Sequence, residues 1–278
     1  MLTSNLIRYV TFSPSFISQI EGIILEPSKI GLNVSVDAVD ACYTPIVQSG
    51  GSYDIKISAQ SDSKVLSPDV IICSLGAKFK GYCANMARTF MVNAAPKVES
   101  TYAILISLYD VCLEKMIPGN ELKDVHAAAK AFLAQKDPSL LSHLPKSLGF
   151  VTGLEFRDSL FVLNEKNTHK FVDGMIITLI VGLHNVPLPT PDQRSGSNMS
   201  VFSLLLADTV RVQTDAIPEV LTKFTKDFGD VSYSISDEVR RPYLLCLLLH
   251  CQRCSNIFPL YNLIGVFLII VFNCYYFM

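Results

Sequence analysis

The sequence predicts an α+β domain whose sheet is mostly antiparallel. Strand-like segments come first, two helix-like segments follow, and further strand-like segments complete the body of the chain. This separation of strands and helices favours antiparallel pairing over the alternation that builds parallel sheets. A chain of 278 residues, 50% of them hydrophobic, is also long and apolar enough for one large packed domain.

Three segments before the helices have the composition of strands. Residues 54–59 alternate polar and apolar side chains, and residues 70–75 form a short apolar run that ends at Gly76. Residues 79–92 are rich in aromatic and other strand-forming residues, and Gly81 marks a bend within them. This last segment therefore predicts two neighbouring strands.

Two helices are predicted in the middle of the chain. After Pro96, apolar residues recur at helical spacings of three and four, and these are Tyr102, Leu105, Leu108, Tyr109, Cys112 and Met116. Pro118 and Gly119 end this helix, and Asn120 is the expected N-cap of the second. The remaining expectations are a short helix at residues 15–25, strands at residues 156–164, 175–183 and 202–212, and a polar loop at residues 187–198.

Charge divides the chain into a body and a hydrophobic end. Lys and Arg total 23 and Asp and Glu total 25, a formal charge of -2, so the chain has neither a global basic field for nucleic acid nor a long acidic tail. After Arg241 the only charged residue is Arg253. We therefore expect an N-terminal remnant at residues 1–14, a globular domain at residues 15–235 and a hydrophobic extension at residues 236–278.

The cysteines of the body show no paired spacing. Cys42, Cys73, Cys83 and Cys112 occur singly, which predicts free and mostly buried thiols in a reducing compartment. In the extension, His250, Cys251 and Cys254 resemble half of a zinc site whose second half is missing. No zinc is predicted there.

Four motifs in one order indicate a known family. They are residues 46–53 (IVQSGGSY), 81–92 (GYCANMARTFMV), 149–158 (GFVTGLEFRD) and 207–212 (ADTVRV), with Asp-Gly-Met at residues 173–175. They resemble the pita-bread (creatinase/aminopeptidase-like) fold of methionine aminopeptidase and aminopeptidase P. Over roughly residues 15–225 they are more similar to the peptidase-like domain of the large subunit of FACT, a histone chaperone. The resemblance implies a curved, mostly antiparallel sheet flanked by helices.

The same resemblance implies that the catalytic site is lost. Peptidases of this fold hold two metal ions with two Asp, one His and two Glu. The matching positions here are Ser74, Asn85, Phe150, Ile180 and Ala207, and a further peptidase histidine falls on Arg157. A divalent pair needs carboxylate and imidazole donors, which these residues do not supply. We therefore predict no catalytic, cofactor-binding or metal-binding residue, and a protein that is not an enzyme.

Several polar residues of the motifs have two interpretations. Ser74 and Asn85 are expected to be polar groups with internal partners in a former cleft. Arg88 and Arg157 suit either an acidic partner or internal pairing with acids such as Glu155 or Asp158. The second interpretation is favoured for both arginines.

The resemblance also implies partners and a location. It predicts a fragment or short isoform of a FACT subunit, in the nucleus on the chromosome, within a complex that reorganises nucleosomes during transcription, replication and DNA repair. The implied partners are chromatin, the core histones (the outer dimer and the central tetramer of the nucleosome) and, in the full-length protein, a small HMG-box subunit. No cofactor or small-molecule substrate is implied. Which histone surface is bound, and whether this short chain acts alone, stay open.

Two other functions are alternatives to this one. The first is an active metallo-aminopeptidase, which the replaced ligand positions disfavour. The second is a membrane-anchored pita-bread protein, since residues 257–278 are uncharged and long enough to cross a bilayer. The extension can equally be an extra core element or an aberrant end such as translated non-coding sequence, and the last of these is favoured.

Overall fold

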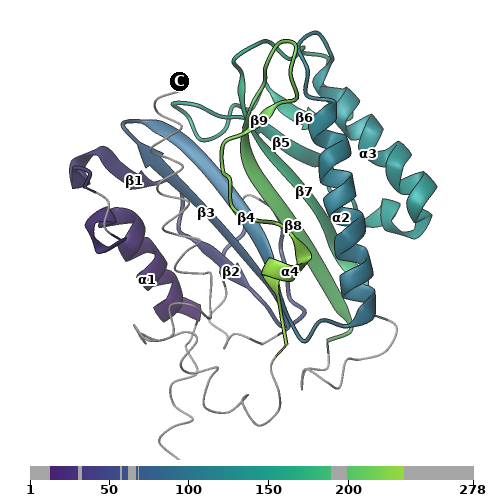
Figure 1. Cartoon of the computed structure of the whole chain (residues 1–278), viewed down its shortest axis with the longest axis horizontal. Coiled ribbons are helices and arrows are strands. Elements are labelled where there is room, and N and C mark those ends of the chain that lie inside the picture. The colour runs from purple at the N-terminus through teal and green to yellow at the C-terminus, as the bar shows by residue number, and fades with distance from the viewer. Residues whose placement is uncertain are drawn as a thin grey trace, which may run out of the picture.

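A mostly antiparallel sheet forms the centre of the computed structural model, which describes residues 13–30, 33–56, 58–61, 67, 69–188 and 199–234. Figure 1 shows its strands side by side, in the order β1 (Val39–Ala41), β3 (Val70–Phe79), β4 (Tyr82–Val92), β8 (Val201–Arg211), β7 (Ile176–Pro187), β5 (Ser147–Val151) and β6 (Val162–Asn164). Three short strands pair with β3, β8 and β4 respectively: β2 (Ile46–Gln48), β9 (Glu219–Val220) and β10 (Ser232–Tyr233). Among the strands that the structure describes, only the pairing of β10 with β4 is parallel.

The helices lie over the sheet and at its edge. They are α1 (Ser13–Leu25), α2 (Pro96–Glu114), α3 (Leu122–Lys136) and α4 (Phe228–Val231), with short 3-10 turns at Pro27–Ile30, Val36–Ala38 and Pro138–His143. In Figure 1, α2 crosses β7 and β8 with α3 beside it, while α1 lies near β1 and β2. The predicted arrangement of a sheet flanked by helices is confirmed.

Local sequence explains where the two long helices begin. Pro96 occupies the first turn of α2, where its missing N–H costs nothing. The N-cap of α3 is Glu121 rather than the predicted Asn120, because Glu121 and Asp124 form a reciprocal capping box. Asn120 instead donates its side-chain amide to the Lys115 carbonyl.

The predicted strands are right where the chain is continuously apolar. Residues 70–75 lie in β3, residues 175–183 overlap β7, and residues 202–212 overlap β8. Lys80 and Gly81 have φ of 47° and 90° and form the tight turn that separates β3 from β4, so residues 79–92 do belong to two neighbouring strands.

Two predicted strands are wrong in whole or in part. The described residues of 54–59 form a loop, because Asp54 accepts a hydrogen bond from the Lys56 N–H and so closes a turn. Of residues 156–164 only β6 is a strand, since Asp158 makes a similar turn with the Leu160 N–H. Polar–apolar alternation over a few residues did not distinguish these turns from strands.

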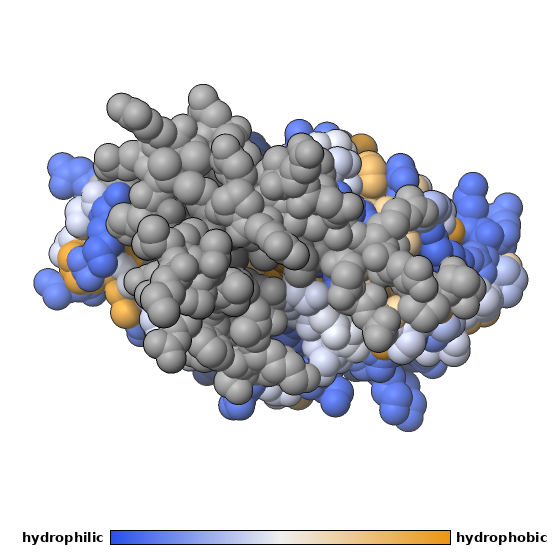
Figure 2. Space-filling view, turned by 90° about the horizontal axis from the view of Figure 1, so that it is seen from below, coloured by the Kyte–Doolittle hydropathy of each residue, from blue (hydrophilic) through white to orange (hydrophobic). Residues whose placement is uncertain are grey.

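The central strands are buried on both faces. Nearly every residue of β4, β7 and β8 is buried, which fits a sheet with one face under the helices and the other under the chain that follows β1. Figure 2 shows one side of the molecule, where hydrophilic residues dominate both ends of the described part and hydrophobic ones form small separate patches.

Some predictions fall on residues that are not described. The extension at residues 236–278, with its half zinc site, lies outside the described residues, as do residues 1–12 of the predicted remnant and most of the predicted loop at 187–198. No helix within the described ranges is long and apolar enough to span a membrane.

Candidate functional site

Register brings together the five positions that the resemblance matches to metal ligands, which are called here the former ligand positions. A row of paired residues crosses four strands: Ser74 on β3 pairs with Ala87 on β4, Ala87 with Ala207 on β8, and Ala207 with Ile180 on β7. Side chains two residues apart on a strand share a face, so Asn85 lies beside this row. Four of the five positions, Ser74, Asn85, Ile180 and Ala207, line one cleft.

The fifth position joins the same cleft through aromatic contacts. Phe150 on β5 pairs with Thr178, two residues before Ile180 on β7. The Phe150 side chain is fully buried and meets Phe156 edge-on, with ring centroids 5.4 Å apart. Phe156 also lines the cleft. An aromatic cluster therefore stands where the resemblance places an imidazole ligand.

Tyr43 fills the space between these positions. The Cys42 N–H donates to the Gly76 carbonyl at 3.0 Å, and Ile46 pairs with Ser74. Only Leu75 lies between Gly76 and Ser74, so the three residues 43–45 loop out opposite it. The looped-out Tyr43 donates its hydroxyl to Asn85 Oδ1, and Ser74 Oγ lies 2.8 Å from the same hydroxyl. Because a phenol has one proton, Ser74 is the donor in the second bond.

Gly76 makes this placement of Tyr43 possible. A Cβ on Gly76 would lie 2.6 Å from Cε1 of the Tyr43 ring, well inside van der Waals contact. The ring then continues into the aromatic cluster, with its centroid 5.2 Å from that of Phe156. The space left in the cleft is about 20 Å³, which is enough for roughly one water molecule.

The cleft is electrostatically unsuited to a metal pair. Burial raises the pKa of the Tyr43 phenol far above its ordinary value, so it stays neutral, although the hydrogen bond with Ser74 opposes this shift. Asp54 and Lys56 reach the margin of the cleft, where the Asp54 carboxylate accepts the Lys56 N–H. No group of three or more His, Cys, Asp or Glu within the described ranges could hold a metal ion.

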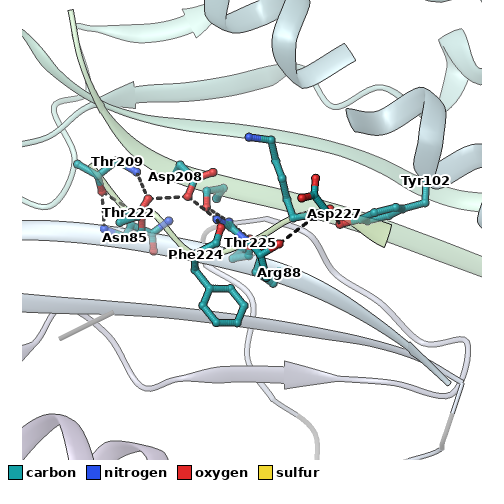
Figure 3. Close-up of polar contacts among 12 residues, drawn as sticks. Asn85, Arg88, Tyr102, Asp208, Thr209, Thr222, Phe224, Thr225 and Asp227 are labelled. Carbon is teal, nitrogen blue, oxygen red and sulfur yellow. Dashed lines mark hydrogen bonds and ion pairs between the residues drawn. The ribbon is translucent and has the colours of Figure 1, made fainter. Parts of the chain in front are cut away.

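Arg88 faces away from the cleft, in a second buried polar cluster (Figure 3). Alternation along β4 and β8 places Arg88 and Asp208 on the helix-covered face, and their ion pair is 2.8 Å long and almost fully buried. The guanidinium also donates to the backbone carbonyls of Ala87, Ala207, Phe224 and Thr225. It thus holds the segment that follows β9 against the sheet.

The predicted internal pairing with an acid is confirmed for Arg88 and wrong for Arg157. The acid that pairs with Arg88 is Asp208, not Glu155 or Asp158, which were given as examples. Arg157 makes an ion pair with neither of those two described acids, and its guanidinium lies 5.7 Å from the centroid of the Phe150 ring. Asp208 and Tyr43 were missed as site residues. The one signal for Tyr43 is its position three residues before the motif at residues 46–53.

Comparison with known proteins identifies the family. Residues 18–214 match the model of metallopeptidase family M24. The chain belongs to this family. Its fold is shared with solved peptidases, such as the X-Pro aminopeptidase of Thermotoga maritima, with a TM-score of 0.59 and 19% identity over 72% of this chain and 51% of that one. At that identity the likeness concerns the fold alone.

Within this fold, the chain is similar to one particular protein. The FACT complex subunit SPT16 of Zea mays is 37% identical over 227 residues, and that of Oryza sativa subsp. japonica is 38% identical over 234 residues. These matches cover 81% and 83% of this chain but 21% of each relative, so the chain spans about a fifth of their length. The N-terminal domain of SPT16 from Cicer arietinum superposes with a TM-score of 0.75 at 36% identity, over 81% of this chain and 52% of that one.

These relatives confirm the resemblance to the large FACT subunit. A second SPT16 N-terminal domain, from Eremothecium gossypii, has a TM-score of 0.72 at 29% identity and covers 84% of this chain and 56% of that one. The more similar proteins are thus named as subunits of a complex, and the peptidases are more distant. The comparisons support a FACT-type, non-enzymatic domain over an active metallo-aminopeptidase.

Proposed function

We propose that this chain is the non-catalytic, peptidase-like domain of a FACT complex subunit and that it contributes histone binding to nucleosome reorganisation. Its place would be the nucleus, on the chromosome, during transcription, replication and DNA repair. The similarity to SPT16 supports this assignment. The observation that carries it is the Tyr43 side chain, hydrogen-bonded to Ser74 and Asn85 where the peptidase fold would hold metal.

The chemistry of the cleft supports binding rather than hydrolysis. Metal-assisted hydrolysis needs a cation to polarise the carbonyl and to activate water. Here the five positions carry a hydroxyl, an amide, two aliphatic side chains and an aromatic ring. Such groups hold a fold together and offer hydrogen bonds, but they do not balance the charge of two divalent ions.

Core histones are basic, so acidic groups on the described surface are the natural first contacts. Two places qualify: the exposed Glu155 with the half-buried Asp158 before β6, and the exposed Asp227 and Asp230 around α4. The whole chain has a formal charge of only -2, which gives weak long-range attraction. We therefore expect affinity of about micromolar or weaker, near −8 kcal/mol, with either the outer histone dimer or the central tetramer. The small HMG-box subunit is proposed as a partner of the longer protein.

A titration of the 278-residue chain with each histone unit at two salt concentrations tests this proposal. Binding should weaken as salt rises, because exposed charges are screened beyond about 8 Å at physiological ionic strength. The double variants Glu155→Gln with Asp158→Asn, and Asp227→Asn with Asp230→Asn, should each be compared with Glu114→Gln on the exposed side of α2. No binding of the wild type at low salt would refute the proposed function, and equal binding by all three variants would refute the acidic contacts.

A further inference from the structure

A groove at the C-terminal end of α2 lies apart from the cleft with the former ligand positions. One wall is the end of α2 with the loop that follows it, and the other is the loop between β8 and β9, which meets that end of the helix (Figure 1). The first wall contributes Glu114, Ile117 and Pro118, and the second contributes residues 213–218. The groove has a volume of about 460 Å³, which is large enough for several side chains of a peptide.

Aliphatic side chains are exposed in and beside this groove. Ile217 is 68% exposed and Ile117 is 40% exposed, one on each wall. Val172, which is 56% exposed, lies on the loop before β7. Exposed aliphatic side chains that gather in one place are typical of a binding surface, whereas singly scattered ones are not.

Hydrogen bonds hold both walls in place. The Gly119 N–H donates to the Phe171 carbonyl at 3.0 Å, which fixes the loop after α2. The N–H and the hydroxyl of Thr214 both donate to the Asp173 carboxylate, at 2.7 and 3.0 Å, which fixes the loop after β8. Because Phe171 and Asp173 lie on one short segment, the two walls share a support. A groove that is already formed loses little conformational entropy on binding.

The charge of the groove favours a basic partner. Among its described lining residues the ionisable side chains are the exposed carboxylates of Glu114 and Asp215, and neither makes an ion pair within the described ranges. Lys115 lines a different groove, between α2 and α3. The carbonyl end of the 19-residue helix α2 adds partial negative charge. Uncompensated negative charge beside exposed aliphatic side chains is complementary to a cation that is carried next to an apolar side chain.

We propose that this groove docks a peptide segment of a partner protein in which an aliphatic side chain neighbours an arginine or a lysine. The aliphatic side chain packs on Ile117 and Ile217, and the cation lies beside the carboxylates of Glu114 and Asp215. This proposal goes beyond histone binding and does not rest on it, because the peptide is defined by its chemistry alone.

Selection from a random peptide library displayed on phage, with the 278-residue chain immobilised, tests the proposal. We expect enriched peptides to carry an aliphatic residue close to an arginine or a lysine. Synthetic copies of these peptides are then titrated by fluorescence anisotropy. Glu114→Gln combined with Asp215→Asn should weaken their binding at least ~10-fold, and so should Ile217→Ser. Asparagine tolerates the φ of 61° at position 215, so this substitution keeps the loop conformation.

Two matched variants separate the groove from non-specific adhesion. Leu160→Ser removes an aliphatic side chain of similar exposure, 67%, from the loop before β6. Glu155→Gln combined with Asp158→Asn removes two carboxylates from that same loop. Both should leave the affinity for the peptides unchanged.

Three results would overturn the proposal. The first is a selection that enriches no peptide, or only peptides without a basic residue. The second is an affinity that the groove variants leave unchanged. The third is self-association of the wild type in analytical ultracentrifugation that Ile217→Ser abolishes, because the occupant would then be a second copy of this chain.

Discussion

At the residue scale, the absence of a side chain at Gly76 determines what fills the cleft. Two groups lie over this glycine, the Cys42 Cβ and the Tyr43 ring. The ring then reaches Ser74 and Asn85, which gives these two neutral residues a hydrogen-bond partner inside the protein. A polar pair that would otherwise be buried without partners is thereby satisfied.

Gly76→Ala should lower the free energy of unfolding by about 1–3 kcal/mol, because the new methyl group would lie 2.6 Å from the Tyr43 ring. Chemical denaturation measures this. In a Tyr43→Ala background the same substitution should cost clearly less, since the ring is gone. Gly153→Ala is the control, because a Cβ there meets no atom within 4 Å. Equal costs with and without Tyr43 would contradict the proposed role of Gly76.

The second decisive residue is Arg88, the largest fully buried polar side chain on the helix-covered face. We expect Arg88→Met to lower the unfolding free energy by about 3–5 kcal/mol, because the buried Asp208 carboxyl group would lose its ion-pair partner. Adding Asp208→Leu should recover part of that loss. Lys29→Met, which breaks the exposed pair with Glu26, should cost at most about 1 kcal/mol. If the double variant is no more stable than Arg88→Met alone, the unpaired charge is not the cause.

At the scale of elements, threonine hydroxyls join β4 to β8. The only paired residues of this contact are Ala87 and Ala207, within the described strands. On one side of them Thr209 Oγ1 donates to Asn85 O and accepts from Asn85 N. On the other side Thr89 Oγ1 does the same with Leu205, at 2.9 and 2.8 Å. Two fully buried hydroxyls thus take the place of backbone-to-backbone hydrogen bonds between β4 and β8 at the centre of the sheet.

Thr89→Val and Thr209→Val keep the side-chain shape but remove these bonds. Each should lower the unfolding free energy by about 1–3 kcal/mol, because a backbone N–H and C=O would be left buried and unpaired. Urea denaturation is the measurement. Ser107→Ala on the exposed side of α2, which removes only a bond to the Ala103 carbonyl, is the control. Costs no larger than that of Ser107→Ala would refute the bridging role.

Elements with a clear period or a long apolar run could be predicted from the sequence. The spacing of Tyr102, Leu105 and Leu108 predicted α2, and β3, β7 and β8 followed from apolar runs. Strands of two or three residues, such as β1, β2, β9 and β10, have no period to detect. Their pairing depends on contacts distant in sequence.

The candidate site could be predicted only in part, for the same reason. The motifs located the five former ligand positions, and the sheet register brings them together. Tyr43 reaches the cleft because residues 43–45 loop out of the strand pairing. The Arg88–Asp208 pair joins side chains 120 residues apart in the sequence. Neither relation appears in local sequence spacing.

At the scale of the whole molecule, the residues that stabilise the fold and the former ligand positions lie on opposite faces of the sheet. The Arg88 cluster and the long helices cover one face, and the neutral cleft lies on the other. The fold therefore has a polar network and a core that do not depend on a bound metal. This separation explains how a member of metallopeptidase family M24 can keep its architecture with other residues at the ligand positions.

The most direct test of this account is the manganese content of the 278-residue chain. The chain is equilibrated with Mn²⁺, freed of excess metal and examined by elemental analysis, with its thermal unfolding recorded in parallel. The account predicts no stoichiometric manganese and an unchanged midpoint, because no binding free energy is available to stabilise the folded state. About two manganese ions per chain, with a raised midpoint and hydrolysis of peptides with Met or X-Pro at the N-terminus, would contradict it.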